Sequence, residues 1–70
     1  MNIKEVIMEL GQNIRRIREE KNLTQVQLAC RIEKANTFLC DIEKCRATPS
    51  LKTIKKIADA LEVDIVELFA

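Results

Sequence analysis

Apolar residues recur at intervals of three and four along most of the chain, which is the spacing of one face of an α-helix. The first stripe consists of Ile3, Val6, Ile7, Leu10, Ile14 and Ile17. It predicts a helix of roughly 18 residues that is capped by Asn2 and ends near Lys21 and Asn22. Gly11 lies within this helix and weakens it by about 1 kcal/mol relative to alanine, so a bend or a fresh helix start is expected there.

Two shorter helical patterns follow, with only a few residues between them. Thr24 and Gln27 have the spacing of a capping box and predict a helix over residues 24–31. Leu39 and Ile42 supply the apolar side of a third helix over residues 36–44, and the break before it contains neither glycine nor proline. Because isolated helices below about 12 to 15 residues are marginal in water, these two helices must be held by packing against the others.

The last part of the chain predicts two more helices. Ser50 is a suitable N-cap for a fourth stripe, which consists of Leu51, Ile54, Ile57, Ala58 and Leu61. Asp64 and Glu67 form a second capping box that opens a short final helix. No alternating strand pattern, linker or internal repeat is visible, so the prediction is an all-α, compact five-helix bundle that forms a single domain over residues 1–70.

Charge is unevenly distributed although the net charge is only +1. Residues 31–56 carry seven basic and three acidic side chains, whereas residues 57–70 carry four acidic side chains and no basic one. A basic middle segment beside an acidic end suggests one face that is turned toward an anion.

Composition excludes several kinds of site. The chain has no His and a single Gly, which removes the usual partner in catalytic triads and any Gly-rich phosphate loop, so we expect no enzyme and no cofactor. Three Cys without an extracellular context favour a reducing cytoplasm over a disulfide framework. They are too few for a structural zinc site, which takes four ligands. No apolar run approaches a membrane span and no signal peptide is visible, so we expect a cytoplasmic protein that does not contact membranes.

The order of motifs resembles the phage repressor/Cro-type (lambda-repressor-like) helix-turn-helix family of DNA-binding regulators. The resemblance covers about residues 10–69 and rests on Thr24-Gln25-x-x-Leu28-Ala29, Leu39-x-x-Ile42-Glu43-Lys44, Pro49-Ser50-Leu51 and Ile57-Ala58-x-Ala60-Leu61. It implies a repressor that binds as a homodimer to double-stranded DNA with a near-palindromic operator. The helices at 24–31 and 36–44 would form the helix-turn-helix, and the second of them would enter the major groove.

The resemblance also implies roles for individual residues. Base contacts fall on Asn36, Thr37 and Asp41, with Phe38 beside them. Contacts with the DNA backbone fall on Gln25, Lys44, Arg46 and the segment 48–51, including Thr48 and Ser50. Arg18 and Glu43 correspond to an internal salt bridge between the first and third helices. The chemistry agrees, because an Asn amide can bind adenine through two hydrogen bonds and Thr can contact thymine.

Three positions depart from the family pattern. Glu33 and Cys45 replace glycines that commonly lie in the turn and after the third helix, where the backbone is left-handed. Ala35 replaces the usual hydroxyl cap of the recognition helix. These substitutions are expected to affect stability and docking and not the fold.

Alternative readings stay open at several positions. Asp41 could pair locally with Lys44 instead of contacting cytosine. Cys30, Cys40 and Cys45 could form a thiol switch, but free cysteines are more often small packing residues. Candidate dimer surfaces are Val66 with Phe69, or the apolar start of the first helix. The rival function is a non-enzymatic protein-interaction module of the same fold that has lost DNA binding; Asp41 and Glu33 favour it, and the basic middle segment opposes it.

Overall fold

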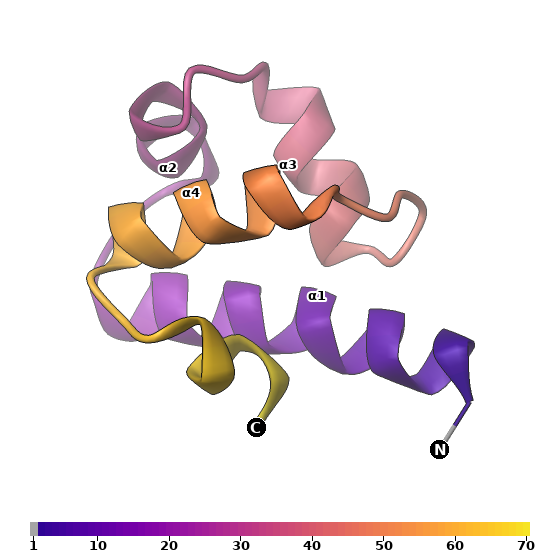
Figure 1. The fold of residues 1–70 in the computed structure, drawn as a ribbon. Helices are drawn as coiled ribbons and strands as arrows, with labels where there is room; N and C mark the ends of the chain where they lie inside the picture. The colour runs from indigo at the N-terminus through magenta and orange to yellow at the C-terminus, as the bar shows by residue number, and fades with distance from the viewer. Residues whose placement is uncertain (1) are drawn as a thin grey trace.

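The computed structural model describes residues 2–70, and within that range the regular elements are all helices. In chain order they are α1 (Ile3–Glu20), α2 (Gln25–Arg31), α3 (Asn36–Glu43), α4 (Leu51–Leu61) and the 3₁₀ helix η1 (Ile65–Phe69). Figure 1 shows α1 and η1 on one side of the molecule, α2 and α3 together on the other, and α4 between them in this view. The predicted all-α class is confirmed, with one difference: the last of the five helices is a 3₁₀ helix and not an α-helix.

Side-chain caps fix where most helices begin. The Asn2 side chain accepts a hydrogen bond from the Glu5 amide at 2.9 Å, and Ser50 accepts one from the Thr53 amide at 3.2 Å. The predicted capping boxes of α2 and η1 are both present, in residues 24–27 and 64–67. Each cap satisfies an amide that has no partner within its helix, so these starts are set by the local sequence.

The helices share one aliphatic core. Every helix contributes to it, and its fully buried large side chains are Ile14, Leu28, Ile32, Leu39, Ile42, Ile57, Leu61 and Leu68. Burial of each such side chain contributes roughly 1.5 to 3 kcal/mol. The short helices α2 and α3, of 7 and 8 residues, are therefore held in place by their inward-facing residues and not by their own helix propensity.

Gly11 marks a close approach between helices and not a break in α1. The helix continues without interruption from Ile3 to Glu20, so the expected bend or restart at this position is wrong. A Cβ atom on Gly11 would lie 2.5 Å from the Ile42 carbonyl oxygen and 3.2 Å from the Cys45 sulfur. The missing side chain thus lets the C-terminal end of α3 sit directly on α1.

Four helix ends use a left-handed residue that is not glycine. The φ angles of Glu33 and Cys45 are 58° and 62°, which confirms the expectation for both positions. Asn22 and Glu62 adopt the same conformation at the ends of α1 and α4, with φ angles of 58° and 59°. Such a backbone costs a residue with a Cβ roughly 1 to 2 kcal/mol, although Asn tolerates it better than most.

Candidate nucleic-acid interface

The corner between α2 and α3 is closed by backbone hydrogen bonds. The Glu33 amide donates to the Cys30 carbonyl at 3.1 Å, and the Lys34 amide donates to the Ala29 carbonyl at 3.0 Å. The left-handed Glu33 makes this pattern possible, since it reverses the chain within one residue. Ala35 then precedes α3 without a side-chain cap, as the sequence predicted.

The corner presents the start of α3 to solvent. Asn36 and Thr37 are exposed, and Asp41 is half-buried one turn further along. Phe38 is also half-buried and packs against the core. Over residues 2–70, Asp41 and Lys44 do not form an ion pair within 4.0 Å, so the local pairing considered for Asp41 is absent. Two polar side chains, an amide and a hydroxyl, therefore project from the first turn of α3.

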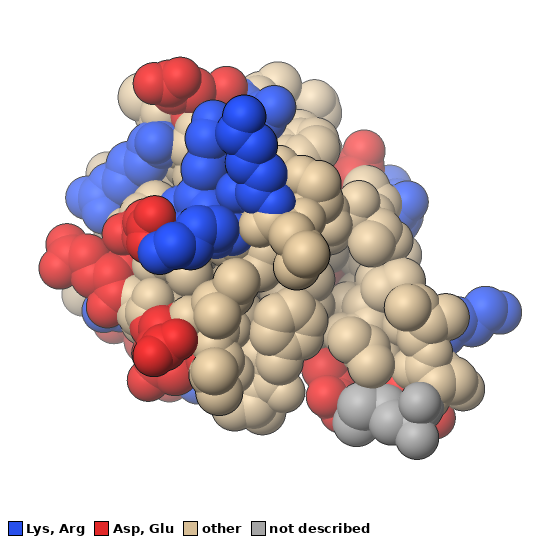
Figure 2. All heavy atoms as spheres, viewed as in Figure 1, with Lys and Arg blue, Asp and Glu red and all other residues tan. Residues whose placement is uncertain are grey.

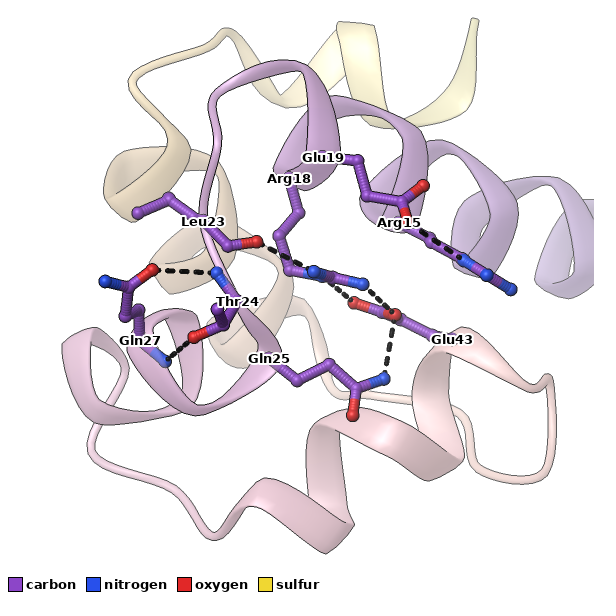
Figure 3. Close-up of polar contacts among 8 residues, drawn as sticks. All are labelled: Arg15, Arg18, Glu19, Leu23, Thr24, Gln25, Gln27 and Glu43. Atoms are coloured by element: carbon purple, nitrogen blue, oxygen red, sulfur yellow. Dashed lines mark hydrogen bonds and ion pairs between the residues drawn. The ribbon is translucent and has the colours of Figure 1, made fainter.

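A buried ion pair ties α3 to α1. Arg18 donates from Nε and Nη2 to the two carboxylate oxygens of Glu43, at 2.7 and 3.0 Å (Figure 3). The side chains are only 9% and 2% exposed, and the Arg18 guanidinium also donates to the Leu23 carbonyl at 2.7 Å. The hydrogen bonds to Glu43 raise the pKa of Arg18, an effect that burial opposes and the Glu43 charge reinforces. The predicted Arg18–Glu43 salt bridge is confirmed.

Gln25 joins this network from the start of α2. Its Nε2 donates to the Glu43 carboxylate at 3.0 Å, a contact that the sequence did not predict (Figure 3). An amide nitrogen carries two hydrogens, so one N–H remains available for a further acceptor. Glu43 thus holds residues from α1 and α2 in fixed relation to α3, and it fixes the amide of Gln25 as well.

The remaining sequence-predicted backbone contacts lie beyond the end of α3. Lys44, Arg46, Thr48 and Ser50 are all exposed. The Arg46 amide donates to the Asp41 carbonyl at 2.8 Å, which folds this segment back over the end of α3. The Ser50 hydroxyl is already engaged, because it caps α4 and bonds the Thr53 hydroxyl at 3.1 Å. The structure therefore brings Lys44 and Arg46 to the C-terminal end of α3, and Gln25 reaches the same end from α2.

Comparison with known proteins decides the family. The helix-turn-helix family profile HTH_3 matches residues 14–68. The chain belongs to this helix-turn-helix family. The resemblance inferred from the motifs is confirmed, and the matched residues include both α2 and α3.

The curated relatives of this helix-turn-helix chain include proteins with different named roles. It is 45% identical over 58 residues to the immunity repressor protein of Bacillus phage phi105. The matched region is 83% of this chain and 40% of the phage protein. It is 33% identical over 63 residues to multiprotein-bridging factor 1 of Candida albicans, covering 90% of this chain and 42% of that protein. The chain therefore spans less than half the length of these two relatives.

A solved structure shows the same arrangement. The restriction-modification controller protein C.AhdI from Aeromonas hydrophila has a TM-score of 0.87 with this chain at 32% identity. The match covers 90% of this chain and 96% of that one. The helix-turn-helix arrangement described above is thus also that of a controller protein of similar size.

The basic charge of this helix-turn-helix protein is divided between two places. Figure 2 shows basic side chains gathered over α4, the helix that carries Lys52, Lys55 and Lys56. Lys55 is paired with Asp59 at 2.7 Å, and this hydrogen bond raises the pKa of Lys55. Only part of the excess charge of residues 31–56 therefore lies beside α3, where Lys34, Lys44 and Arg46 are exposed.

Two further features bear on the sequence predictions. All three cysteines are free, with Cys30 exposed and the other two half-buried. Within residues 2–70, no helix combines the length and apolar character that crossing a membrane requires. Of the candidate dimer surfaces, Val66 and Ile3 are well exposed, at 68% and 73%, and Phe69 is 38% exposed.

Proposed function

We propose that this protein is a sequence-specific DNA-binding transcriptional regulator, a repressor without catalytic activity that acts in the cytoplasm. Residues 1–70 form its DNA-binding domain. The observation that carries the proposal is the exposed first turn of α3, with Asn36 and Thr37, on a helix whose far end is fixed to α1 by the buried Arg18–Glu43 pair. The major groove is about 12 Å wide and admits a helix. A short helix whose position is set before binding is suited to enter it.

Reading of bases is assigned to the outer side chains of α3. The Asn36 amide can donate to and accept from adenine at the same time, which contributes about 1 to 3 kcal/mol of discrimination. Thr37 can offer its methyl group to thymine or its hydroxyl to either base. The Asp41 carboxylate can accept from the amino group of cytosine. The half-buried Phe38 lies beside these three residues.

Phosphate contacts are assigned to the C-terminal end of the recognition helix and the segment after it. The free N–H of Gln25 suits a phosphate oxygen, because Glu43 already fixes the amide that carries it. Lys44 and Arg46 supply positive charge at the same end, with Thr48 and Ser50 beyond them. Such contacts set the register of the protein on the duplex and leave sequence choice to the base contacts.

We further propose that the protein binds a near-palindromic operator as a homodimer. Two recognition helices related by a two-fold axis would meet half-sites about 34 Å, or one helical turn, apart. The exposed Val66 and Phe69 on η1 offer an apolar surface for the second copy. The names of the phage immunity repressor and the restriction-modification controller support regulation of transcription as the role.

Selection of bound duplexes from a random library tests the proposal. A repeated half-site should emerge, and Asn36→Ala should lose about 1 to 3 kcal/mol on the selected site while choice relaxes at one base pair. Gln12→Ala, which removes an exposed amide from α1, is the matched control and should bind like the wild type. Equal loss on every sequence would refute base reading by Asn36, and absence of binding at low salt would refute the function.

One observation favours a second candidate. A relative that is 33% identical is named multiprotein-bridging factor 1, and Glu33 and Asp41 place negative charge around α3. A protein-interaction module of this fold would bind mixed genomic DNA weakly or not at all at low salt. The DNA-binding function predicts strong binding there that falls steeply as salt rises.

A further inference from the structure

Lys34 occupies a fixed place at the entrance to α3. Its amide donates to the Ala29 carbonyl at 3.0 Å, and the preceding Glu33 has a φ angle of 58°, so its backbone is held by the closed corner. The residue itself is exposed and stands two positions before Asn36. Its Cα therefore cannot move away from the reading end of the helix without opening the corner.

The Lys34 side chain is held as well. Its ammonium nitrogen lies 5.6 Å from the centroid of the Phe38 ring, within the range of a cation–π contact. Phe38 is half-buried against the core, so the ring is a stable support for the cation. Within residues 2–70, no carboxylate lies within 4.0 Å of the ammonium, and its charge is not neutralised by an ion pair.

We propose that Lys34 is a DNA-backbone contact at the entrance of the recognition helix and that Phe38 is its positioning residue. This inference rests on the proposed DNA-binding function. It assigns Phe38 to holding the cation in place, which differs from the base contact that the family resemblance implies. Lys34 also adds a positive charge near α3, where Glu33 and Asp41 are negative.

The dimensions of α3 support this assignment. A helix of 8 residues is about 12 Å long at 1.5 Å per residue, which is close to the width of the major groove. Lys34 precedes this helix and Lys44 follows it, so the two ammonium groups flank the segment that reads bases. Phosphates line the groove on both sides, and a cation at each end of the helix can engage one strand each.

Binding measured against salt concentration tests the role of Lys34. Fluorescence anisotropy with one labelled operator duplex should show that Lys34→Ala flattens the plot of log affinity against log salt by about 0.9 per lost contact. The ratio of wild-type affinity to Lys34→Ala affinity should then fall roughly 3.5-fold for each lost contact as the salt concentration rises from 50 to 200 mM. Lys34→Arg should keep the wild-type slope, because a guanidinium also stacks on an aromatic ring.

Lys21→Ala is the matched control. It removes the same charge from an exposed position at the end of α1, beside Val63 and Glu67 and away from the corner. Its slope should equal that of the wild type. Equal slopes for Lys34→Ala and Lys21→Ala would overturn the inference while leaving the DNA-binding function intact. Failure of the wild type to bind DNA would overturn the function itself.

A second pair of variants tests Phe38. Phe38→Leu keeps the charge of Lys34 but removes the ring, so its slope should fall between those of the wild type and Lys34→Ala. Adding Phe38→Leu to Lys34→Ala should change the slope no further, because the cation that Phe38 positions is already absent. If the role of Phe38 were purely structural, Phe38→Leu would leave the slope unchanged in the wild type as well. Circular dichroism of each variant confirms that folded protein is compared. If Phe38→Leu does not fold, an upfield shift of the Lys34 side-chain protons in the wild-type NMR spectrum provides the test, and its absence overturns the positioning role.

Discussion

Replacement of one member of the Arg18–Glu43 pair should destabilise the protein far more than replacement of both. Glu43→Leu leaves the Arg18 guanidinium buried with a single protein acceptor, the Leu23 carbonyl. Arg18→Met leaves the Glu43 carboxylate with one donor, Gln25, at a side chain that is 2% exposed. Each single change thus strands a charge, and the double change strands none.

The magnitude follows from burial. Breaking a fully buried pair costs about 3 to 5 kcal/mol, whereas replacing both members by apolar residues of similar volume is often neutral or stabilising. The exposed fractions of 9% and 2% place this pair close to the buried limit. We therefore expect each single variant to lose about 3 kcal/mol. The double variant should stay within about 1 to 2 kcal/mol of the wild type, because the half-buried Gln25 loses one hydrogen bond.

Urea unfolding of the wild type, the two single variants and the double variant completes a double-mutant cycle, which gives the coupling free energy between Arg18 and Glu43. The chain has no Trp and no Tyr, so far-ultraviolet circular dichroism is the suitable probe. A 70-residue domain has a total stability of roughly 3.5 to 10 kcal/mol, so a single variant can lie near its unfolding midpoint without urea. Glu43→Gln, which keeps the shape and an acceptor, provides a milder perturbation if Glu43→Leu does not fold.

The exposed Arg16–Glu20 pair on α1 is the matched control. Its atoms are 3.3 Å apart but its side chains are 53% and 61% exposed. The same cycle there should give a coupling of only about 0.3 to 0.5 kcal/mol. A coupling that small for Arg18 and Glu43 would refute the reasoning, because it would mean that their burial does not strengthen their interaction.

Four more substitutions, one of them with a control, test other parts of the structure. Lys44→Ala and Arg46→Ala should weaken binding to specific and random DNA alike. Measured by anisotropy, each should reduce the slope of log affinity against log salt by about 0.9 per lost contact. An unchanged slope would place these side chains away from the phosphates. Gly11→Ala should destabilise by about 1 to 2 kcal/mol in urea unfolding, since the new Cβ would lie 2.5 Å from the Ile42 carbonyl oxygen; a gain, as helix propensity alone predicts, would contradict the close approach. Glu33→Gly should stabilise by about 0.5 to 1 kcal/mol through relief of its left-handed backbone, and Glu33→Ala, which keeps a Cβ, should not.

Features that depend on short stretches of sequence were predictable. The caps at Asn2, Thr24, Ser50 and Asp64 involve residues three positions apart at most, and all four are present. The aliphatic stripes likewise located each helix, because a buried face must repeat with the period of the helix. The Arg18–Glu43 pair spans 25 residues and was predicted only from the family resemblance.

Features that depend on how helices meet could not be predicted in the same way. The sequence around Gly11 is the same whether the glycine bends the helix or makes room for the carbonyl of another helix. Only the position of the Ile42 carbonyl in the fold shows that it makes room. The Gln25 bond to Glu43 and the Lys34 contact with Phe38 likewise depend on side-chain placement around the corner. Asn13, which donates to the Leu68 and Ala70 carbonyls, gave no sequence signal, because these partners lie more than 50 residues away.

The separation between the buried pair and the outer side chains of α3 has an evolutionary consequence. Over residues 2–70, the exposed side chains of Asn36 and Thr37 form no hydrogen bond with the rest of the fold, so a mutation there leaves folding nearly unaffected. Either single mutant of the Arg18–Glu43 pair should lose about 3 kcal/mol, so these two buried positions are far less free to change one at a time. Under the proposed function, single mutations at Asn36 and Thr37 would change the preferred DNA sequence, while the Arg18–Glu43 pair that holds α3 would stay the same.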